Sequence, residues 1–488
     1  MSQDIRNQEP KAVWSHFADL NAVPRPSKKE EIVIQFMVDF GKKLHLETFV
    51  DKVGNVIIKK HATAGMEDRK TIVMQGHLDM VHQKNSDTDF DFDKEGIKMF
   101  VDGDWIKAQG TTLGADNGLG VAAIMAVLSS TEIAHPTIEA LFTIDEETGM
   151  TGAMGLEGGV LEGEILLNLD TEEDDEIGIG CAGGVDVTAT RTYLEDETPE
   201  NSTAFLITVK GLNGGHSGMD IIKGLGNANK IMNRILFDGF ANFGLRIADI
   251  NGGSLRNAIP RESVATVVID TISKEPFLFE TNELINNIKE EFLTLEANLT
   301  IEIQEVISPK KVMDLGVQEG FTKAIYAALN GVYRMSPDVE GLVETSNNIA
   351  RIIVKDGAIK VGCLTRSSSE TNKWDLANSL RACFELAGFD VEFSGTYPGW
   401  LPNMNSEILK IVATIYSDLF KEDARVAACH AGLECGILGQ NYPKIDMISF
   451  GPTIRGAHSP DERAQISSTQ KFWKLLLEIL KNIPKKNA

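Results

Sequence analysis

Candidate metal ligands near both ends of the chain place the strongest constraint on how it can fold. They lie in short segments, most of them next to glycine: Gly76-His77-Leu78-Asp79, Gly114-Ala115-Asp116-Asn117-Gly118, Asp145-Glu146-Glu147, Asn168-Leu169-Asp170 and Gly456-Ala457-His458. Two histidines with several carboxylates form the donor set that a pair of divalent metal ions needs. If His458 shares a site with His77 and Asp116, the end of the chain must rejoin its beginning, and the residues between them form an inserted domain.

The N-terminal third alternates between helical and strand patterns, which predicts an α/β domain. Residues 30–44 and 118–130 have helical patterns. Residues 71–74, 138–144 and 165–169 are apolar runs followed by polar or acidic residues, as expected of buried strands. Open α/β sheets form their sites outside the C-terminal ends of such strands. We therefore expect an α/β catalytic domain, with a mixed sheet flanked by helices, whose strand ends carry the site.

A different pattern begins after Cys181-Ala182-Gly183-Gly184. Alternating, strand-like stretches are here separated by helical patterns, which indicates an α+β unit with antiparallel strands. The strand-like stretches are 204–209, 245–250, 264–269, 299–303 and 349–354, and the helical ones are 219–237, 317–329 and 370–386. Residues 394–399 have the composition of a linker. We therefore predict a catalytic domain formed by residues 1–184 and 398–488, with an inserted lid domain at 185–397.

The composition is typical of a globular protein, and the net charge disfavours some classes of binding partner. With 488 residues, the chain is too long for one ordinary core. A net charge of −24 disfavours nucleic acid and anionic membranes as partners, although simple solubility also explains such a charge. We see no signal-peptide pattern and no apolar run long enough to span a bilayer. The five scattered cysteines lack CxxC spacing, which indicates a reduced, cytoplasmic setting.

Each candidate residue has an ordinary explanation when it is considered alone. His77 and Asp79 are two apart on a strand and face the same side, so Asp79 can orient a metal-bound His77. The alternative is a strand-end histidine beside a solvated aspartate. Asp116 also suits a helix N-cap. The acidic pair Glu146 and Glu147 could divide proton transfer and metal binding, but such clusters are usually solvated loops.

Together, these segments resemble the co-catalytic zinc aminopeptidase/carboxypeptidase superfamily. The resemblance lies in HLDMV, GADNG, DEETGM, NLDTEE and GAHSPDE. Within the superfamily they are most similar to the bacterial aminoacylhistidine dipeptidases, also called peptidase D or cytosolic non-specific (Xaa-His) dipeptidases. The resemblance covers the full chain in the same order, with a similar lid insertion. One departure is Asn117, where many members have Asp; the branch that this chain resembles accepts Asn.

The resemblance implies two divalent metal ions per subunit, Zn²⁺ in the first place, with Co²⁺ or Mn²⁺ as substitutes. One ion would take His77 and Asp170, and the other would take Glu147 and His458. Asp116 would bridge both ions, and a cis peptide bond would follow it. These roles come from the resemblance and not from the spacing.

The resemblance also implies catalytic and substrate-binding residues. Glu146 would be the general base and Asp79 the acid that orients a metal ligand. His216 lies in a segment like the one whose histidine reaches the substrate carbonyl in the family, often from the partner subunit; a plain turn histidine is the alternative. Asn257 lies in a segment like the lid turn that contacts the substrate. Arg366 can clamp a terminal carboxylate with its planar fork, and Glu434 offers a partner for the substrate's ammonium group.

The expected function is that of a metallo-dipeptidase for short unblocked peptides, including Xaa-His dipeptides. A metal-bridged hydroxide would attack the peptide carbonyl, with Glu146 as general base. An N-acyl amino acid deacylase or a tripeptidase on the same scaffold is the alternative. A non-catalytic, metal-dependent binding protein is a remote one, because a metal store needs no base beside its ligands. HExxH, GxSxG and GxxxxGK[ST] segments are absent from the sequence. A cytoplasmic homodimer, paired through the lid domain, is expected.

Overall fold

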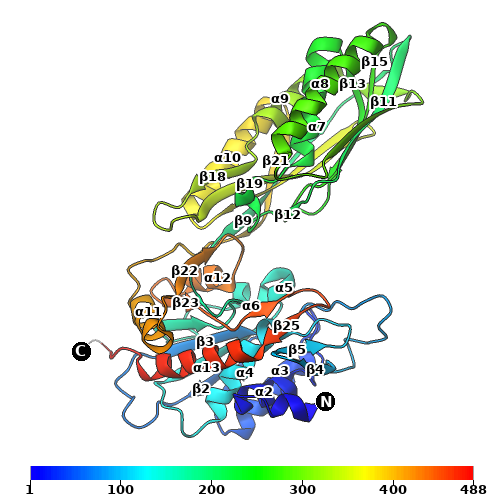
Figure 1. The fold of residues 1–488 in the computed structure, drawn as a ribbon. Helices are drawn as coiled ribbons and strands as arrows, with labels where there is room; N and C mark the ends of the chain where they lie inside the picture. The colour runs from blue at the N-terminus through cyan, green and yellow to red at the C-terminus, as the bar shows by residue number, and fades with distance from the viewer. Residues whose placement is uncertain (1, 487–488) are drawn as a thin grey trace. The chain divides into compact units, whose positions relative to one another are not determined.

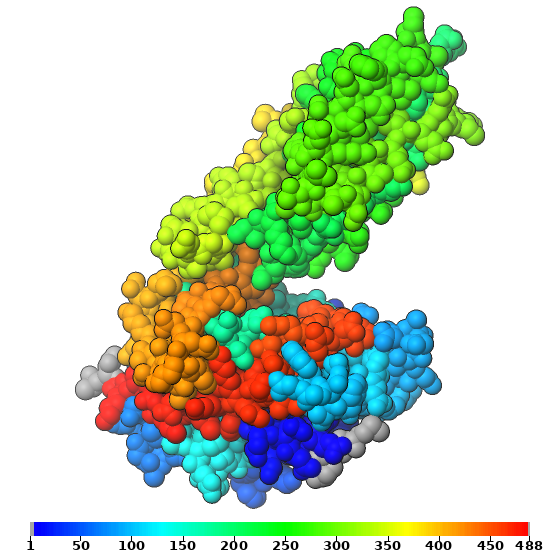
Figure 2. Space-filling model, in the orientation of Figure 1, coloured from blue at the N-terminus to red at the C-terminus, as the bar shows by residue number. Residues whose placement is uncertain are grey.

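The computed structural model describes residues 2–486, which form two compact units. The first unit combines the residues up to Gly180 with Trp400–Ala428 and with the residues from Leu433 onward. The second unit comprises Cys181–Gly399 together with Cys429–Gly432. Figure 2 shows this division by colour, because blue, cyan, orange and red residues share one unit while green and yellow residues form the other. Both ends of the chain therefore build one unit, as the distribution of candidate ligands requires.

The first unit is built on a mixed sheet with the strand order β1-β2-β6-β3-β7-β23-β8-β22. Its central strands β6, β3, β7 and β23 run parallel to one another, whereas β8 pairs antiparallel with β23, and β2 pairs antiparallel with both β1 and β6. The strands are β1 (Glu47–Val50), β2 (Val56–Lys60), β3 (Ile72–His77), β6 (Ile138–Thr143), β7 (Ile165–Asn168), β8 (Glu176–Cys181), β22 (Arg425–Cys429) and β23 (Asp446–Ser449). A smaller sheet has the order β24-β25-β5-β4, from Ile454–Arg455, Arg463–Gln465, Trp105–Ala108 and Met99–Asp102.

Every residue of β3, β6 and β7 is buried, which explains why their sequences are continuous apolar runs and not alternating ones. Helix α4 packs on β3 and against α2, and α11 packs against α13 and β23 (Figure 1). The helices of this unit are α1 (Ser2–Arg6), α2 (Lys11–Leu20), α3 (Glu31–Lys43), α4 (Ala115–Ser129), α5 (Glu146–Gly149), α6 (Thr151–Gly155), α11 (Glu407–Phe420), α12 (Glu434–Asn441) and α13 (Ile466–Lys481). The predicted α/β class and the strand and helix assignments of the N-terminal third are confirmed.

The register of the parallel strands brings three polar chain segments to one edge of the sheet. His77, the last residue of β3, pairs with Thr143, the last residue of β6. Gln75 of β3 pairs with Asn168, the last residue of β7, so the chain after Asn168 continues level with His77. The polar residues that follow each strand are therefore neighbours at this edge.

The second unit contains an antiparallel sheet with the order β16-β11-β15-β13-β19-β20-β9-β21, and β18 also pairs with β19. The strands are β9 (Gly183–Thr192), β11 (Ser202–Lys210), β13 (Arg246–Gly253), β15 (Ser263–Asp270), β16 (Thr300–Val306), β18 (Gly331–Met335), β19 (Val343–Lys355), β20 (Ala358–Ser367) and β21 (Asp390–Tyr397). Two short ladders join β10 (Glu195–Glu197) to β17 (Lys311–Met313) and β12 (Gly215–His216) to β14 (Ala258–Ile259). The predicted α+β character of this part is confirmed.

Four helices cover one face of this sheet and share a hydrophobic core with it (Figure 1). They are α7 (Ala228–Phe243), α8 (Lys274–Phe292), α9 (Leu315–Ala327) and α10 (Glu370–Leu386). The predicted helix over 219–237 is wrong at its start, because the chain first forms a short 3₁₀ turn, Ile221–Lys223, that ends at the left-handed Gly224. The side chain of Asn227 then caps α7 by accepting the N–H groups of Asn229 and Lys230.

The predicted linker over 394–399 is also partly wrong. Residues 394–397 belong to β21, which pairs with β9 through Ser394↔Asp186 and Tyr397↔Gly184. A register shift between these two pairs accommodates the turn-forming composition of the segment. Within the described residues, no helix is both long and apolar enough to cross a membrane.

Candidate metal centre

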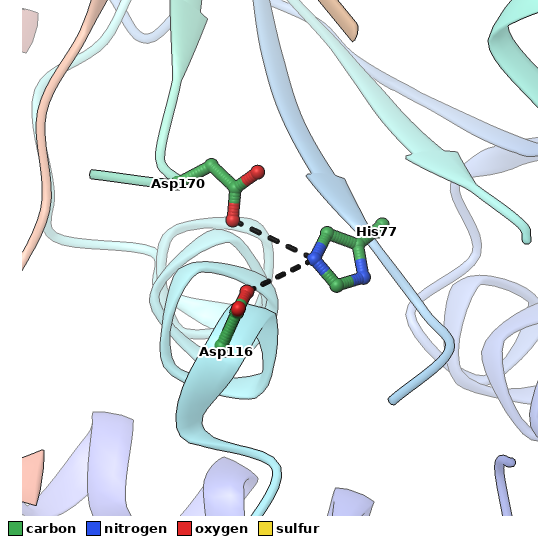
Figure 3. A group of neighbouring side chains, drawn as sticks. All are labelled: His77, Asp116 and Asp170. Carbon is green, nitrogen blue, oxygen red and sulfur yellow. Dashed lines mark hydrogen bonds and ion pairs between the residues drawn. The ribbon is translucent and has the colours of Figure 1, made fainter. Parts of the chain in front are cut away.

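His77 is held in a fixed orientation at the end of β3. Its side chain is fully buried, and Nδ1 lies 3.1 Å from the carbonyl oxygen of Asp79 and 3.4 Å from Asp79 Oδ1. Nε2 points the other way, 3.1 Å from Asp116 Oδ1 and 3.6 Å from Asp170 Oδ1 (Figure 3). One ring nitrogen is thus held by Asp79, while the other faces two carboxylates.

Asp116 presents its two carboxylate oxygens to two different histidines. Oδ1 faces His77, and Oδ2 lies 3.3 Å from Nε2 of His458. The backbone at Asp116 and Asn117 departs from helical geometry inside α4, and the Asp116–Asn117 peptide bond is cis, as the resemblance implied. The Asn117 amide donates to the carbonyl oxygen of Leu169 at 2.6 Å, a bond that an aspartate at this position could not make when ionised.

Glu146 and Glu147 begin the short helix α5 directly after Asp145, which has a left-handed backbone at φ 53°. The carboxylate of Asp79 accepts both of their backbone N–H groups, from Glu146 at 3.0 Å and from Glu147 at 3.3 Å. Oε2 of Glu147 lies 3.0 Å from Nε2 of His458. Asp79 therefore positions His77 and the acidic turn together.

The arrangement fits two divalent cations that share Asp116. One group of ligand atoms comes from His77, Asp116 and Asp170, and another from Asp116, Glu147 and His458, each within 4.8 Å of one another. Oε1 of Glu147 and Oδ1 of Asp170 are buried and have no hydrogen-bond partner among the described residues. Buried carboxylate oxygens are costly without a partner, and bound cations would satisfy them.

Geometry alone does not separate the roles of the two glutamates. His77, Glu146 and Glu147 form a third group within the same distance. The difference is that Oε2 of Glu147 contacts His458, whereas Glu146 forms no ion pair with His458 among the described residues. Glu147 is thus the one that joins the second histidine.

The clustered carboxylates give the site a surplus of negative charge, which shifts the pKa of several of its groups. Burial raises the pKa of Asp170 to about 6, and burial likewise raises the pKa of Glu146 well above its usual range. Hydrogen bonds with Asp116 and Glu147 raise the pKa of His458 to about 11. Burial lowers the pKa of His77, but the Asp170 carboxylate and the other acidic partners outweigh it and raise this pKa well above its usual value.

Glu434 lies at the start of α12 in the same unit and is 1% exposed. Its Oε2 accepts hydrogen bonds from Gln75 and Thr143, both at 2.6 Å, and its Oε1 has no hydrogen-bond partner among the described residues. Burial raises the pKa of Glu434 to about 8. A buried acid with one free oxygen is suited to a cationic group.

In the second unit, His216 and Asn257 are brought together by the β12–β14 ladder. His216 pairs with Ala258, and the carbonyl oxygen of Asn257 accepts the N–H of Ser217 at 2.8 Å. Nδ1 of His216 accepts the N–H groups of Gly218 and Met219, so the imidazole proton is on Nε2 when the ring is neutral.

Arg366 and His430 are also neighbours in the second unit. Nη1 of Arg366 donates to the hydroxyl of Tyr397 at 2.8 Å, and its buried Nε has no hydrogen-bond partner among the described residues. His430 is buried, and its Nε2 lies 2.8 Å from Ser346 Oγ. Burial and the charges of Arg366 and His216 lower the pKa of His430 to about 3, so this ring is neutral.

Sequence reasoning missed four residues that support the site. Gln75 and Thr143 hold Glu434, and the position of each, at or near the end of a strand predicted to carry the site, was the available signal. Glu462 and Arg25 bind the backbone around Asp116. Glu462 lies in the GAHSPDE segment, four residues after His458, whereas Arg25 had no recognisable signal.

The chain is similar to known proteins along its whole length. Residues 73–482 match "Peptidase family M20/M25/M40". The cytosol non-specific dipeptidase of Escherichia coli (strain K12) is 42% identical over 483 residues, covering 99% of this chain and all of the relative. The crystal structure of aminoacylhistidine dipeptidase from Vibrio alginolyticus is 43% identical, with a TM-score of 0.93 and full coverage of both chains. The aminopeptidase PepT from Bacillus cereus shares the fold, with a TM-score of 0.57 at 15% identity, covering 98% of this chain and 99% of that one.

Proposed function

Since the chain belongs to peptidase family M20/M25/M40 and is therefore a metallopeptidase, we propose that it is a dipeptidase. Its substrates are short unblocked peptides, including Xaa-His dipeptides. The observation that carries this proposal is the carboxylate of Asp116, whose two oxygens face His77 and His458 beside the acidic turn of Glu146 and Glu147. Full-length similarity to a dipeptidase and an aminoacylhistidine dipeptidase supports the substrate class.

We assign the ligands as follows. His77 and Asp170 would hold one cation, Glu147 and His458 would hold the other, and Asp116 would contribute a ligand to both. Zn²⁺ is the first choice because nitrogen and carboxylate ligands suit it, and Co²⁺ or Mn²⁺ are substitutes. When bound, the ions supply Lewis acidity, which polarises the peptide carbonyl and lowers the pKa of water.

Glu146 is the general base in this proposal. It accepts a proton from the attacking water and passes it to the nitrogen of the leaving amine. The raised pKa of Glu146, caused mainly by burial, brings its carboxyl group closer to the range in which it can both accept and release a proton. Asp79 holds the turn that carries Glu146 through the Glu146 N–H.

The remaining assignments concern the substrate. His216 donates its Nε2 proton to the carbonyl oxygen as negative charge develops there, from its own subunit or from a partner subunit. Asn257 contacts the substrate beside His216, and Arg366 binds the terminal carboxylate. Glu434 binds the ammonium group through its free oxygen.

The remaining proposals concern organisation and location. We propose catalytic segments 1–184 and 398–488, a lid and dimerisation segment 185–397, and a homodimer formed through that lid. The cytosolic naming of the Escherichia coli relative supports a cytoplasmic location.

A substrate panel tests the proposed function. The purified protein is assayed with several dipeptides including Xaa-His, with a tripeptide and with an N-acetylated amino acid, each before and after treatment with a chelator. We expect hydrolysis of dipeptides that is lost on chelation and restored by Zn²⁺. A preference for the acetylated compound would instead assign a deacylase, and a preference for the tripeptide would assign a tripeptidase.

A further inference from the structure

We propose that Glu462 and Arg25 are positioning residues that set the metal affinity of the site by holding the 113–116 turn in place. Neither residue touches the ligand atoms of the proposed centre through its own side chain. Both instead bind the backbone that presents Asp116. This inference rests on the proposed metal centre and concerns how that centre is kept in shape.

Glu462 acts as the acceptor for a whole turn of backbone. Glu462 is 2% exposed. Oε2 accepts the N–H groups of Leu113 and Gly114 at 2.7 and 2.9 Å, and Oε1 accepts those of Ala115 and Asp116 at 2.7 and 3.3 Å. Four successive N–H groups that precede regular helix geometry are thus satisfied by one side chain far away in the sequence.

Arg25 binds the same turn from another direction and ties it to the end of β3. Its guanidinium, 1% exposed, donates from Nη2 to the carbonyl oxygen of Gly114. Nη1 donates to the carbonyl oxygens of Leu78 and Asp79 at 3.0 and 3.1 Å, directly after His77. The guanidinium of Arg25 therefore binds both the segment that follows His77 and the turn that carries Asp116.

Arg25 is packed so closely against the turn that it leaves no room for a side chain at Gly114 or Gly118. A Cβ at Gly114 would lie 2.5 Å from Nη2 of Arg25, and a Cβ at Gly118 would lie 2.7 Å from the same atom. Gly114 also has a left-handed backbone at φ 68°, which glycine adopts without strain. The turn is therefore held by Arg25 on one side and by Glu462 on another.

Glu462, which holds the 113–116 turn, lies in the same loop as His458. Glu462 follows His458 by four residues, and its N–H donates to the carbonyl oxygen of Ser459. The loop that carries His458 thus also carries the side chain that fixes the bridging aspartate. If two metal ions share Asp116, one of its carboxylate oxygens must face His77 and the other must face His458. Glu462 and Arg25 keep the backbone of the turn in the position that allows this.

The test measures binding of Zn²⁺ alone. In Glu462→Gln, the amide offers one acceptor oxygen and turns an NH₂ group toward two backbone N–H donors. We expect Zn²⁺ affinity, measured by competition with a chromophoric chelator, to fall roughly 10–100-fold, as is usual for partners of metal ligands. The visible spectrum of the Co²⁺-loaded protein should also change, because the ligand geometry is altered.

Glu139→Gln is the matched control. Glu139 is also a buried carboxylate of the first unit, accepts the N–H groups of Glu162 and Gly163, and pairs with Lys59. It lies near the start of β6, whereas the site lies beyond the end of that strand. We expect this variant to lose thermal stability while it keeps the wild-type Zn²⁺ affinity and Co²⁺ spectrum.

Arg25→Lys provides a second, independent variant. A lysine keeps the charge but cannot reach the separate acceptors that the guanidinium serves, so a similar fall in Zn²⁺ affinity is expected. If Glu462→Gln does not fold, as judged by circular dichroism, the inference is tested by comparing the Zn²⁺ affinity of Arg25→Lys with that of Glu139→Gln. Zn²⁺ affinity within about twofold of wild type in the folded variants would overturn the inference. A wild-type protein that binds fewer than two ions would instead contradict the proposed metal centre itself.

Discussion

The carboxylate of Asp79 accepts the backbone N–H of Glu146 at 3.0 Å. The same carboxylate lies 3.4 Å from the Nδ1 of His77 and accepts the hydroxyl of Ser27 at 2.8 Å. One buried side chain therefore orients a proposed metal ligand and the turn that presents the proposed general base. A change at Asp79 must affect metal binding and proton transfer together.

Replacing Asp79 by asparagine tests this double role. The amide can accept on one oxygen only, so it cannot hold both His77 and the 146–147 turn as the carboxylate does. We expect Zn²⁺ affinity to fall roughly 10–100-fold and kcat to fall as well. Titration with a chelator and steady-state kinetics at saturating Zn²⁺ measure the two effects. Asp39→Asn, on the exposed side of α3, is the control and should change neither; a kcat of Asp79→Asn that recovers fully at high Zn²⁺ would limit Asp79 to metal binding.

Replacing Glu146 by glutamine separates the base from the ligands. Glutamine is nearly isosteric but cannot accept a proton at neutral pH, so we expect activity to fall by several orders of magnitude. Metal analysis of the purified variant should still find about two ions per subunit, because the proposed ligand set lacks Glu146. Loss of one ion together with activity would reassign Glu146 as a ligand, in keeping with its place in the third group of ligand atoms.

Replacing His216 by alanine tests the proposed donor of the second unit. The donor matters most as charge develops on the carbonyl oxygen, so kcat should fall more than substrate binding. Loss of one such donor typically costs roughly 10²–10³ in kcat. Circular dichroism and metal content should stay at wild-type values. His61→Ala, an exposed histidine of the first unit, is the control, and a near-normal kcat for His216→Ala would leave His216 as a turn residue only.

The pKa shifts predict that protons and metal ions compete for the site. Hydrogen bonds to Asp116 and Glu147 raise the pKa of His458 to about 11, so this ring is protonated at neutral pH when metal is absent, and the raised pKa of His77 favours protonation of that ring as well. Metal binding needs neutral imidazoles and must release these protons. Zn²⁺ affinity should therefore rise as the pH rises from about 6 to about 8.

Calorimetry checks this prediction. Titrations of the metal-free protein with Zn²⁺, in buffers of different ionisation enthalpy at pH 7, should show the release of more than one proton per subunit.

The raised pKa of His458 also makes the folding stability of the metal-free protein depend on pH. Because the folded pKa of His458 is raised, its contribution to stability is present below about pH 6.5 and is lost as the pH rises toward 11. A Zn²⁺ affinity that does not vary between pH 6 and 8 would contradict the predicted competition between protons and metal ions.

Much of the local structure could be predicted from short-range patterns. The apolar runs that became β3, β6 and β7 are buried on both faces, so their composition identifies them without knowledge of their neighbours. The helix that became α10 was predicted with its observed bounds, since Ser369 caps it and its apolar spacing is regular. The start of α7 was missed because the left-handed Gly224 interrupts a stretch that is otherwise helical in pattern.

The sequence by itself determined which side chains could form a metal centre, because histidines and carboxylates at strand ends and glycine turns are chemically distinctive. His77, Asp116, Glu147, Asp170 and His458 were all singled out, and the structure gathers them into two groups of possible ligand atoms that share Asp116. Only the tertiary structure decided what holds them there. The bonds of Glu462 to residues 113–116 and of Arg25 to Gly114 join residues far apart in the chain. Such bonds leave no local pattern, because a backbone N–H or carbonyl acceptor looks the same at every residue, and only folding selects which side chain meets it.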